Sequence, residues 1–196
     1  MTEHPEDNLT PKELFDQIGN DPSQWSATAE ALLTAAEVLD SQFSQTPEDN
    51  FDEFWEFFKF HTVSMMLKGM ATECLLKAIW ISRISHLVTN GKYRHISGTK
   101  SHDLLSLIEA IEAHFDLGLS RDETKILPVL SNAIVIGRYP INTSIGKRPS
   151  KPNWLKEMKW CKWEIPKDQK IFESLLAKLI NYIDLDDQQS GAIGPR

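Results

Sequence analysis

PEDNFDEFWEFFKFHTVSMMLKGMATECLLKAIWISRISHLV, residues 47–88, is the longest periodic stretch of the 196-residue sequence, and it decides the fold. Its small and apolar positions recur at alternating intervals of three and four residues: Trp55, Phe58, Thr62, Met65, Gly69, Thr72, Leu76 and Ile79. This spacing forms one continuous helix face, which lets a helix lie along others in a bundle. Unbroken, the helix would reach roughly 60 Å at 1.5 Å per residue. We therefore expect a bend near Gly69 and a stop at Asn90-Gly91.

Five shorter helices are predicted around this stretch from caps and apolar periodicity. They cover residues 10–18, 24–43, 101–117, 120–138 and 167–183, with Thr10, Ser101 and Ser120 as caps and a kink or late start at Pro128. The fold class is therefore all-α, a bundle of four to five core helices with an added N-terminal helical arm. We assign residues 1–45 to the arm, 46–185 to the bundle and 186–196 to a disordered tail.

The charge is unevenly distributed along the chain. The 21 Lys and Arg against 28 Asp and Glu give a formal charge of −7, so no overall positive field attracts nucleic acid. Residues 1–60 contain 14 acidic and 2 basic side chains, whereas residues 138–170 contain 9 basic and 3 acidic ones. This polarity indicates intramolecular complementarity, a masked anion site or simply two solvated faces.

Several classes of protein are excluded. The acidic start lacks a secretory signal, charges interrupt the apolar stretch 51–88, and the two cysteines, Cys74 and Cys161, are far apart. We therefore expect a cytoplasmic protein that does not enter the membrane. Gly-rich phosphate loops and nucleophile elbows are missing, and the six histidines lack metal-ligand spacing. No cofactor or metal is expected.

Three short motifs follow one another in the predicted bundle. Glu73 and Lys77 share one side of the long helix, Ser101-His102-Asp103-Leu104 opens the next helix, and Arg138-Tyr139-Pro140 closes a later one. Each also has a structural interpretation: an i,i+4 ion pair, a histidine beside a cap, and a cation at a helix C-terminus. Over about residues 55–183, their order and spacing resemble the HEPN superfamily, the higher-eukaryote and prokaryote nucleotide-binding helical domains.

The resemblance implies a homodimeric helical bundle with a positively lined cleft that binds RNA or a nucleotide. Many members are metal-independent ribonucleases of toxin–antitoxin or defence type, in which a His follows an Arg within a few residues. Here no His follows Arg138. Our first hypothesis is therefore an RNA- or nucleotide-binding module without catalysis. The second is a degenerate ribonuclease, with His102 as proton carrier and Arg138 or Arg94 holding phosphate, and the third is a structural bundle that binds a partner protein.

A basic, aromatic segment supplies further candidates. Trp154, Lys156, Lys159, Trp160, Lys162 and Trp163 alternate cations with rings on which bases stack. The same tryptophans also suit a buried core or a surface for a partner protein. The candidate ligand-binding residues are Glu73, Lys77, Arg94, His102, Arg138, Tyr139, Lys147, Arg148, Lys156, Lys159 and Lys162, of which His102 and Arg138 are also the catalytic candidates.

Overall fold

The computed structural model describes residues 9–42, 51–138, 163 and 166–190. Its described helices are α1 (Pro11–Gly19), α2 (Pro22–Ser41), α3 (Phe51–Arg83), α4 (Leu104–Glu112), α5 (Arg121–Arg138) and α7 (Lys167–Ser190). Two short strands, β1 (Val88–Thr89) and β2 (Lys92–Tyr93), form an antiparallel hairpin. The predicted all-α bundle is confirmed.

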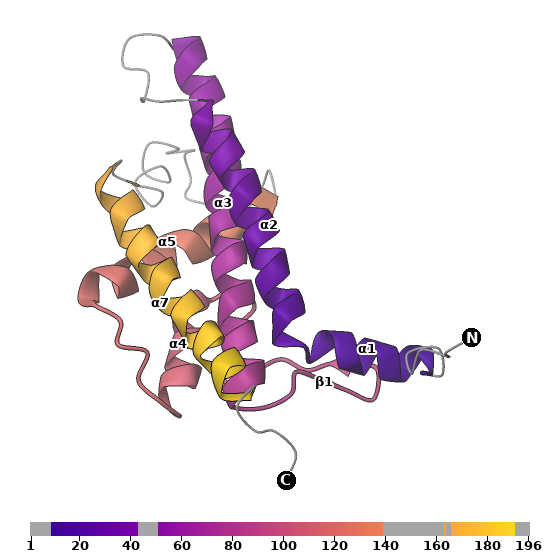
Figure 1. Ribbon diagram of the computed structural model, residues 1–196. Coiled ribbons are helices and arrows are strands. Elements are labelled where there is room, and N and C mark those ends of the chain that lie inside the picture. Colours follow the sequence, from indigo (N-terminus) through magenta and orange to yellow (C-terminus); the bar gives the residue numbers. More distant parts are fainter. Residues whose placement is uncertain (1–8, 43–50, 139–162, 164–165, 191–196) are drawn as a thin grey trace.

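Helix α3 is the centre of the bundle. Helix α2 packs along one side of it, while α4, α5 and α7 pack on the other, and α1 extends away from the foot of α2 (Figure 1). The core lies where α3, α4, α5 and α7 meet, and its fully buried side chains include Leu76, Ile79, Ile108, Leu127, Leu130, Ile134, Phe172 and Leu175. The predicted N-terminal arm is thus packed on the bundle through α2.

Helix α3 continues through Gly69 without a break. A Cβ at this position would lie 2.7 Å from both the Leu130 carbonyl oxygen and the Ile134 Cγ1. Such a distance is impossible for non-bonded carbon, so only glycine allows the backbones of α3 and α5 to approach this closely. The glycine therefore serves helix packing, and the bend expected near Gly69 stays a prediction.

The prediction that the long helix ends at Asn90-Gly91 was wrong. Helix α3 ends at Arg83, and Asn90 and Gly91 form the turn of the hairpin, with φ angles of 59° and 71°. Two successive residues with positive φ are what a two-residue hairpin turn requires, and Asn-Gly is the preferred pair. The Asp16 carboxylate of α1 accepts the N–H groups of Asn90 at 2.7 Å and Gly91 at 2.6 Å, which fastens α1 to this turn.

The helix starts follow the predicted capping chemistry in two of three cases. Thr10 and Ser120 each cap a helix reciprocally with a glutamate three residues later. The cap of α4, however, is Asp103 and not Ser101, because the Asp103 carboxylate accepts from the Ser106 N–H. Helix α5 begins at Arg121, so the late start at Pro128 is also wrong. Helix α7 extends to Ser190, beyond the predicted end of the helix.

Candidate functional site

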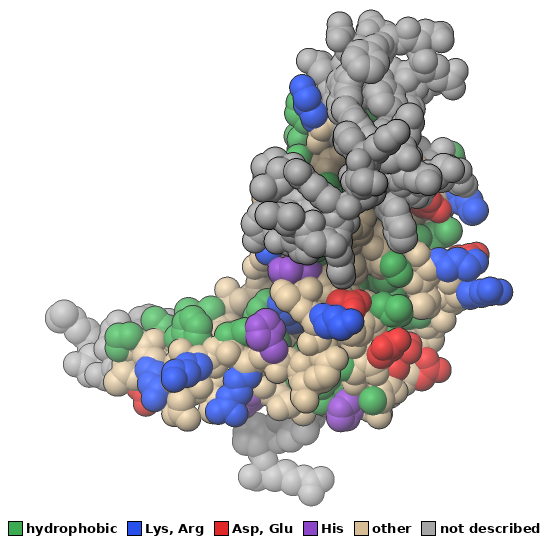
Figure 2. Space-filling model, turned by 180° about the vertical axis from the view of Figure 1, so that it is seen from behind, with side chains coloured by type: hydrophobic (Ala, Val, Ile, Leu, Met, Phe, Trp, Pro, Cys, Tyr) green, Lys and Arg blue, Asp and Glu red, His purple; other side chains and the backbone are tan. Residues whose placement is uncertain are grey.

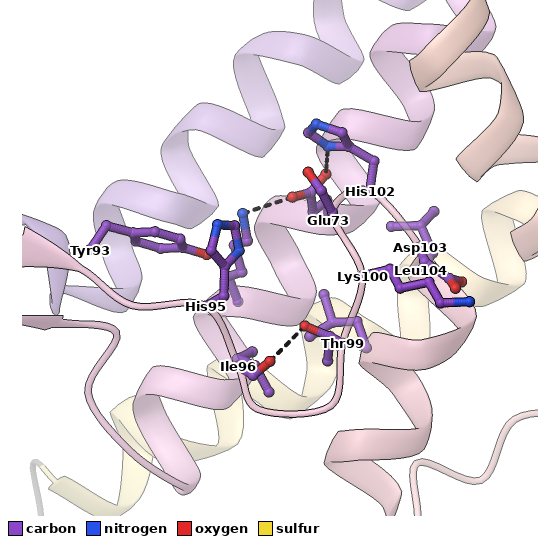
Figure 3. Close-up of a pocket in the computed structure, with 12 residues that line it drawn as sticks. Glu73, Tyr93, His95, Ile96, Thr99, Lys100, His102, Asp103 and Leu104 are labelled. Atoms are coloured by element: carbon purple, nitrogen blue, oxygen red, sulfur yellow. Dashed lines mark hydrogen bonds and ion pairs between the residues drawn. The ribbon is translucent and has the colours of Figure 1, made fainter. Parts of the chain in front are cut away.

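Glu73, His102 and Arg138, which are far apart in the sequence, meet in one hydrogen-bonded chain. Glu73 Oε2 lies 2.9 Å from His102 Nδ1, and His102 Nε2 lies 3.0 Å from Arg138 Nη1. Glu73 Oε1 accepts from Lys77 Nζ at 2.7 Å. Figure 3 shows Glu73 pointing to His102 on one side and joined to a lysine ammonium on the other. We call these four residues the Glu-His-Arg cluster.

Three different elements position the cluster. Glu73 and Lys77 lie one turn apart in the middle of α3, and Arg138 is the last residue of α5. His102 precedes α4 in a turn and has φ 62°, a left-handed conformation that is unusual for a non-glycine residue. The Ser131 hydroxyl of α5 accepts the Leu104 N–H at 3.0 Å, which fixes the start of α4 against α5. His102 is therefore held over α3 beside Arg138, and not in the first helical turn as predicted.

The hydrogen bonds of His102 fit one tautomer of its ring. Arginine only donates, so the His102 Nε2 beside Arg138 must offer a lone pair. The proton of a neutral imidazole then lies on Nδ1, where it is donated to Glu73. In general-base histidines, a carboxylate accepts the proton of one imidazole nitrogen, and the other nitrogen carries the lone pair that takes up a proton. In this tautomer His102 is an oriented base next to a cation.

Charge pairing on the inner side keeps Glu73 ionised. Burial pushes the pKa of Glu73 upward, but the Lys77 ammonium and the hydrogen bond from His102 outweigh it, so the pKa falls below its usual range. For Lys77, burial acts in the opposite direction and lowers the pKa. The Glu73 carboxylate and the Tyr93 phenol more than offset this effect, so the pKa of Lys77 is raised. Both groups are therefore charged near neutral pH.

Two aromatic rings enclose Lys77. Its ammonium lies 5.1 Å from the centroid of Trp25 in α2 and 5.4 Å from that of Tyr93 in β2. Cations are attracted to ring faces at such distances. The N-terminal arm and the hairpin thus contribute directly to the surroundings of Glu73. Sequence reasoning missed both residues, although the Asn90-Gly91 hairpin signal was available to place Tyr93.

The cavity beside the cluster is small. Its volume is about 30 Å³, and Tyr93, His95, Thr99, Lys100 and Asp103 are among the residues that surround it (Figure 3). Such a volume holds one or two water molecules. A larger ligand therefore has to lie across the outer side of the cluster, where Arg138 is exposed and the side chain of His102 is 27% exposed.

The other predicted ligand-binding residues are placed differently. Arg94 follows β2 and lines a separate groove rather than the cavity at the cluster. Trp163 packs against Phe172 at 5.9 Å and lies over Lys68 at 5.4 Å, which confirms the core interpretation for this tryptophan. The candidates Tyr139, Lys147, Arg148, Lys156, Lys159 and Lys162 lie outside the described residues.

The described ranges lack two further features. They contain no group of three or more His, Cys, Asp or Glu side chains arranged to hold a metal ion. None of the helices, over the part that the structure describes, has an apolar segment long enough to cross a membrane. No family model, curated protein or solved structure matches the chain, so its geometry and sequence are the basis for any functional assignment.

Proposed function

We propose that the chain is a HEPN-like RNA-binding module whose Arg138 receives a backbone phosphate. The observation that carries the proposal concerns Arg138: it is exposed, it bonds the imidazole of His102, and no carboxylate pairs with it among the described residues. Glu73 is already neutralised by Lys77. The outer side of the Glu-His-Arg cluster therefore presents a cation that lacks a described counter-charge, as a phosphate site requires.

The sequence beyond Arg138 supports a polyanion as the ligand. Residues 138–170 are the most basic part of the chain, with 9 basic and 3 acidic side chains. A long anion such as RNA contacts several cations along one track, whereas a single phosphate uses one. The order of the three motifs resembles that of the HEPN superfamily, and this resemblance also favours RNA as the ligand. The expected homodimer and a partner protein stay predictions.

Binding of a fluorescent single-stranded RNA, measured by anisotropy at low and high salt, tests this proposal. We expect Arg138→Ala to weaken binding by about tenfold or more, since hydrogen bonds to charged groups contribute about 1.5–3 kcal/mol. It should also reduce the salt slope by about one. Arg121→Ala is the matched control, because Arg121 is an exposed arginine at the opposite end of α5, about 26 Å away at 1.5 Å per residue.

Two outcomes would contradict the proposal. One is no detectable affinity at low salt, which would favour the third hypothesis, a partner-binding bundle. The other is an equal loss of affinity in Arg138→Ala and Arg121→Ala, which would show that only net charge matters. Circular dichroism of each variant establishes that it is folded.

The lone pair on His102 Nε2 favours a second candidate function, metal-independent RNA cleavage. A phosphate that takes over Arg138 frees Nε2 to accept the proton of a ribose 2′-hydroxyl. The 2′-oxygen then bonds to phosphorus, the bond to the 5′-oxygen breaks, and the leaving oxygen takes a proton from the imidazolium or from water. The products are a 2′,3′-cyclic phosphate and a 5′-hydroxyl.

Incubation of RNA with the protein and a chelator tests this second candidate. We expect cleavage by the wild type, none by His102→Ala, and none of an RNA with 2′-deoxy sugars. His102→Ala should still bind RNA, because Arg138 is retained. Equal cleavage by wild type and variant, or none by either, removes cleavage while leaving the binding proposal intact.

A further inference from the structure

A second concave surface lies next to the Glu-His-Arg cluster. It is an open groove of about 590 Å³ between the end of α3 and the hairpin, lined by Trp80, Ser85, His86, Leu87, Thr89, Arg94, His95, Ile96 and Ser97. It shares His95 and Ile96 with the small cavity beside Glu73. We call it the hairpin groove. Its volume is within the range of small-molecule sites, about 300–1,000 Å³, whereas the inner cavity is far below it.

The hairpin groove combines cationic, polar and aromatic groups. None of the described residues that line it is acidic, while Arg94, His86 and His95 are all exposed. Three hydroxyl groups, from Ser85, Thr89 and Ser97, add neutral hydrogen-bonding partners. The apolar surface that a ligand can reach in the groove comes from Trp80, which is partly exposed. Leu87 and Ile96 are almost completely buried and offer little surface. The groove thus suits a flat, polar ligand with a negative charge.

The surroundings extend this positive character. Lysine and arginine side chains gather on the lower left of Figure 2. Lys12 of α1, Lys92 of β2 and Arg94, which follows β2, are exposed. The two carboxylates of α1 are both hydrogen-bonded, Asp16 by the N–H groups of Asn90 and Gly91 and Glu13 by the N–H and hydroxyl of Thr10. An anion that approaches the groove meets Arg94 directly, since Arg94 belongs to the groove lining.

His95 links the two sites. Its ring packs edge-on against Tyr93 at 5.3 Å, and Tyr93 in turn lies over Lys77. Figure 3 shows Tyr93 and His95 side by side at the edge of the cavity. The hairpin groove therefore adjoins the small cavity beside the Glu-His-Arg cluster through His95 and Ile96.

We propose that the hairpin groove binds a second nucleotide of the same RNA strand, with Arg94 on its phosphate and its base against the exposed surface of Trp80. This inference rests on the proposed RNA binding and adds a subsite to it. An aromatic surface beside a cation is how single strands are bound, because every base has a face that stacks. A lipid or an apolar peptide would need a larger apolar lining than Trp80 offers.

Binding of two probes to the full chain tests the proposal: adenosine monophosphate and an eight-nucleotide single-stranded RNA. We expect Arg94→Ala to abolish measurable binding of the mononucleotide at the groove and to weaken the oligonucleotide about tenfold. Lys92→Ala removes an exposed cation from the same hairpin without touching the groove lining, so it should change either affinity by less than about threefold. Trp80→Phe keeps a ring and should retain binding, whereas Trp80→Leu should lose it.

Arg138→Ala makes the two proposals distinguishable. If the groove is a separate subsite, Arg138→Ala weakens the oligonucleotide but leaves mononucleotide binding unchanged. A mononucleotide lost in Arg138→Ala and retained in Arg94→Ala would overturn the groove proposal and leave the phosphate site at Arg138. An oligonucleotide weakened by Arg94→Ala and unaffected by Arg138→Ala would support the groove and overturn the proposed function. If Arg94→Ala binds both probes with the same affinity as the wild type, the groove proposal is overturned.

Discussion

Replacing Glu73 with glutamine tests whether the Glu-His-Arg cluster is held together by charge. Glutamine keeps the shape of the side chain, but it loses the carboxylate that accepts from both Lys77 and His102. The amide nitrogen of a glutamine would also face one of these two donors. Lys77, whose side chain is only 17% exposed, would be left without its counter-charge.

The cost follows from the burial of this pair. Hydrogen bonds to charged groups contribute about 1.5–3 kcal/mol, and exposed ion pairs about 0–1 kcal/mol. Because the Glu73 side chain is 14% exposed, we expect Glu73→Gln to lower the free energy of unfolding by about 2 kcal/mol. For a chain of this size, each kcal/mol lost lowers the Tm by about 2–4 °C, so we expect the Tm to fall by about 4–8 °C.

The pKa shifts of Glu73 and Lys77 determine how this stability difference changes with pH. The pKa of Glu73 is lowered in the folded state, so its stabilisation is present above its usual value of 4.5 and is lost as the pH falls through the folded-state pKa. The pKa of Lys77 is raised, so its stabilisation is present below 10.5 and is lost as the pH rises through the folded-state pKa. The stability difference between wild type and Glu73→Gln should therefore be largest between these limits and shrink at both ends.

Thermal unfolding followed by circular dichroism from acid to alkaline pH measures this difference. Asp122→Asn is the control, since it breaks an ion pair with Lys125 whose side chains are 61% and 59% exposed, and its Tm should not change. Equal Tm values for Glu73→Gln and wild type at pH 7 would refute the reasoning. A difference that persists undiminished at acid pH would do the same.

Three further predictions concern the contacts that position the site. Glu123→Gln should lower the free energy of unfolding at neutral pH but not at the acid end. Burial raises the pKa of Glu123, but Lys178 and the hydrogen bonds from Ser120 and Ser174 outweigh it and lower the pKa to about 2, so the stabilisation is lost as the pH falls from 4.5 through that value. Acid unfolding of the wild type and the variant measures this difference. Gly69→Ala should cost about 1–3 kcal/mol in urea unfolding, because a Cβ would meet the Leu130 carbonyl oxygen at 2.7 Å, and an unchanged midpoint would contradict the close packing of α3 and α5. Trp25→Ala should slow RNA cleavage, because Trp25 lies over Lys77, which pairs with Glu73, and should leave Arg138-dependent binding within about threefold; the cleavage and anisotropy assays measure the two effects.

Local chemistry made most helices predictable. The reciprocal caps at Thr10 and Ser120 are set by residues three apart, and both were read correctly. The errors arose where two local interpretations compete. Asn90-Gly91 suits both the end of a helix and a hairpin turn, and the hairpin prevails because Asp16 and Asn20 bind its backbone from α1. Ser101 and Asp103 both suit a helix cap, and the fixing of Leu104 by Ser131 places the start at Asp103.

The amino-acid sequence by itself determined the helical class and the seam of α3, because periodicity and capping depend on neighbours within one or two turns. Glu73, His102 and Arg138 became candidates through the order of their motifs, which resembles the HEPN superfamily. Only the tertiary structure decided that Glu73, His102 and Arg138 form one hydrogen-bonded chain. It also decided that Trp25 and Tyr93 enclose Lys77 and that Arg94 belongs to another groove. The physical reason is that these contacts join residues far apart in the chain, 29 positions for Glu73 and His102 and 36 for His102 and Arg138, and their distances depend on how whole helices pack.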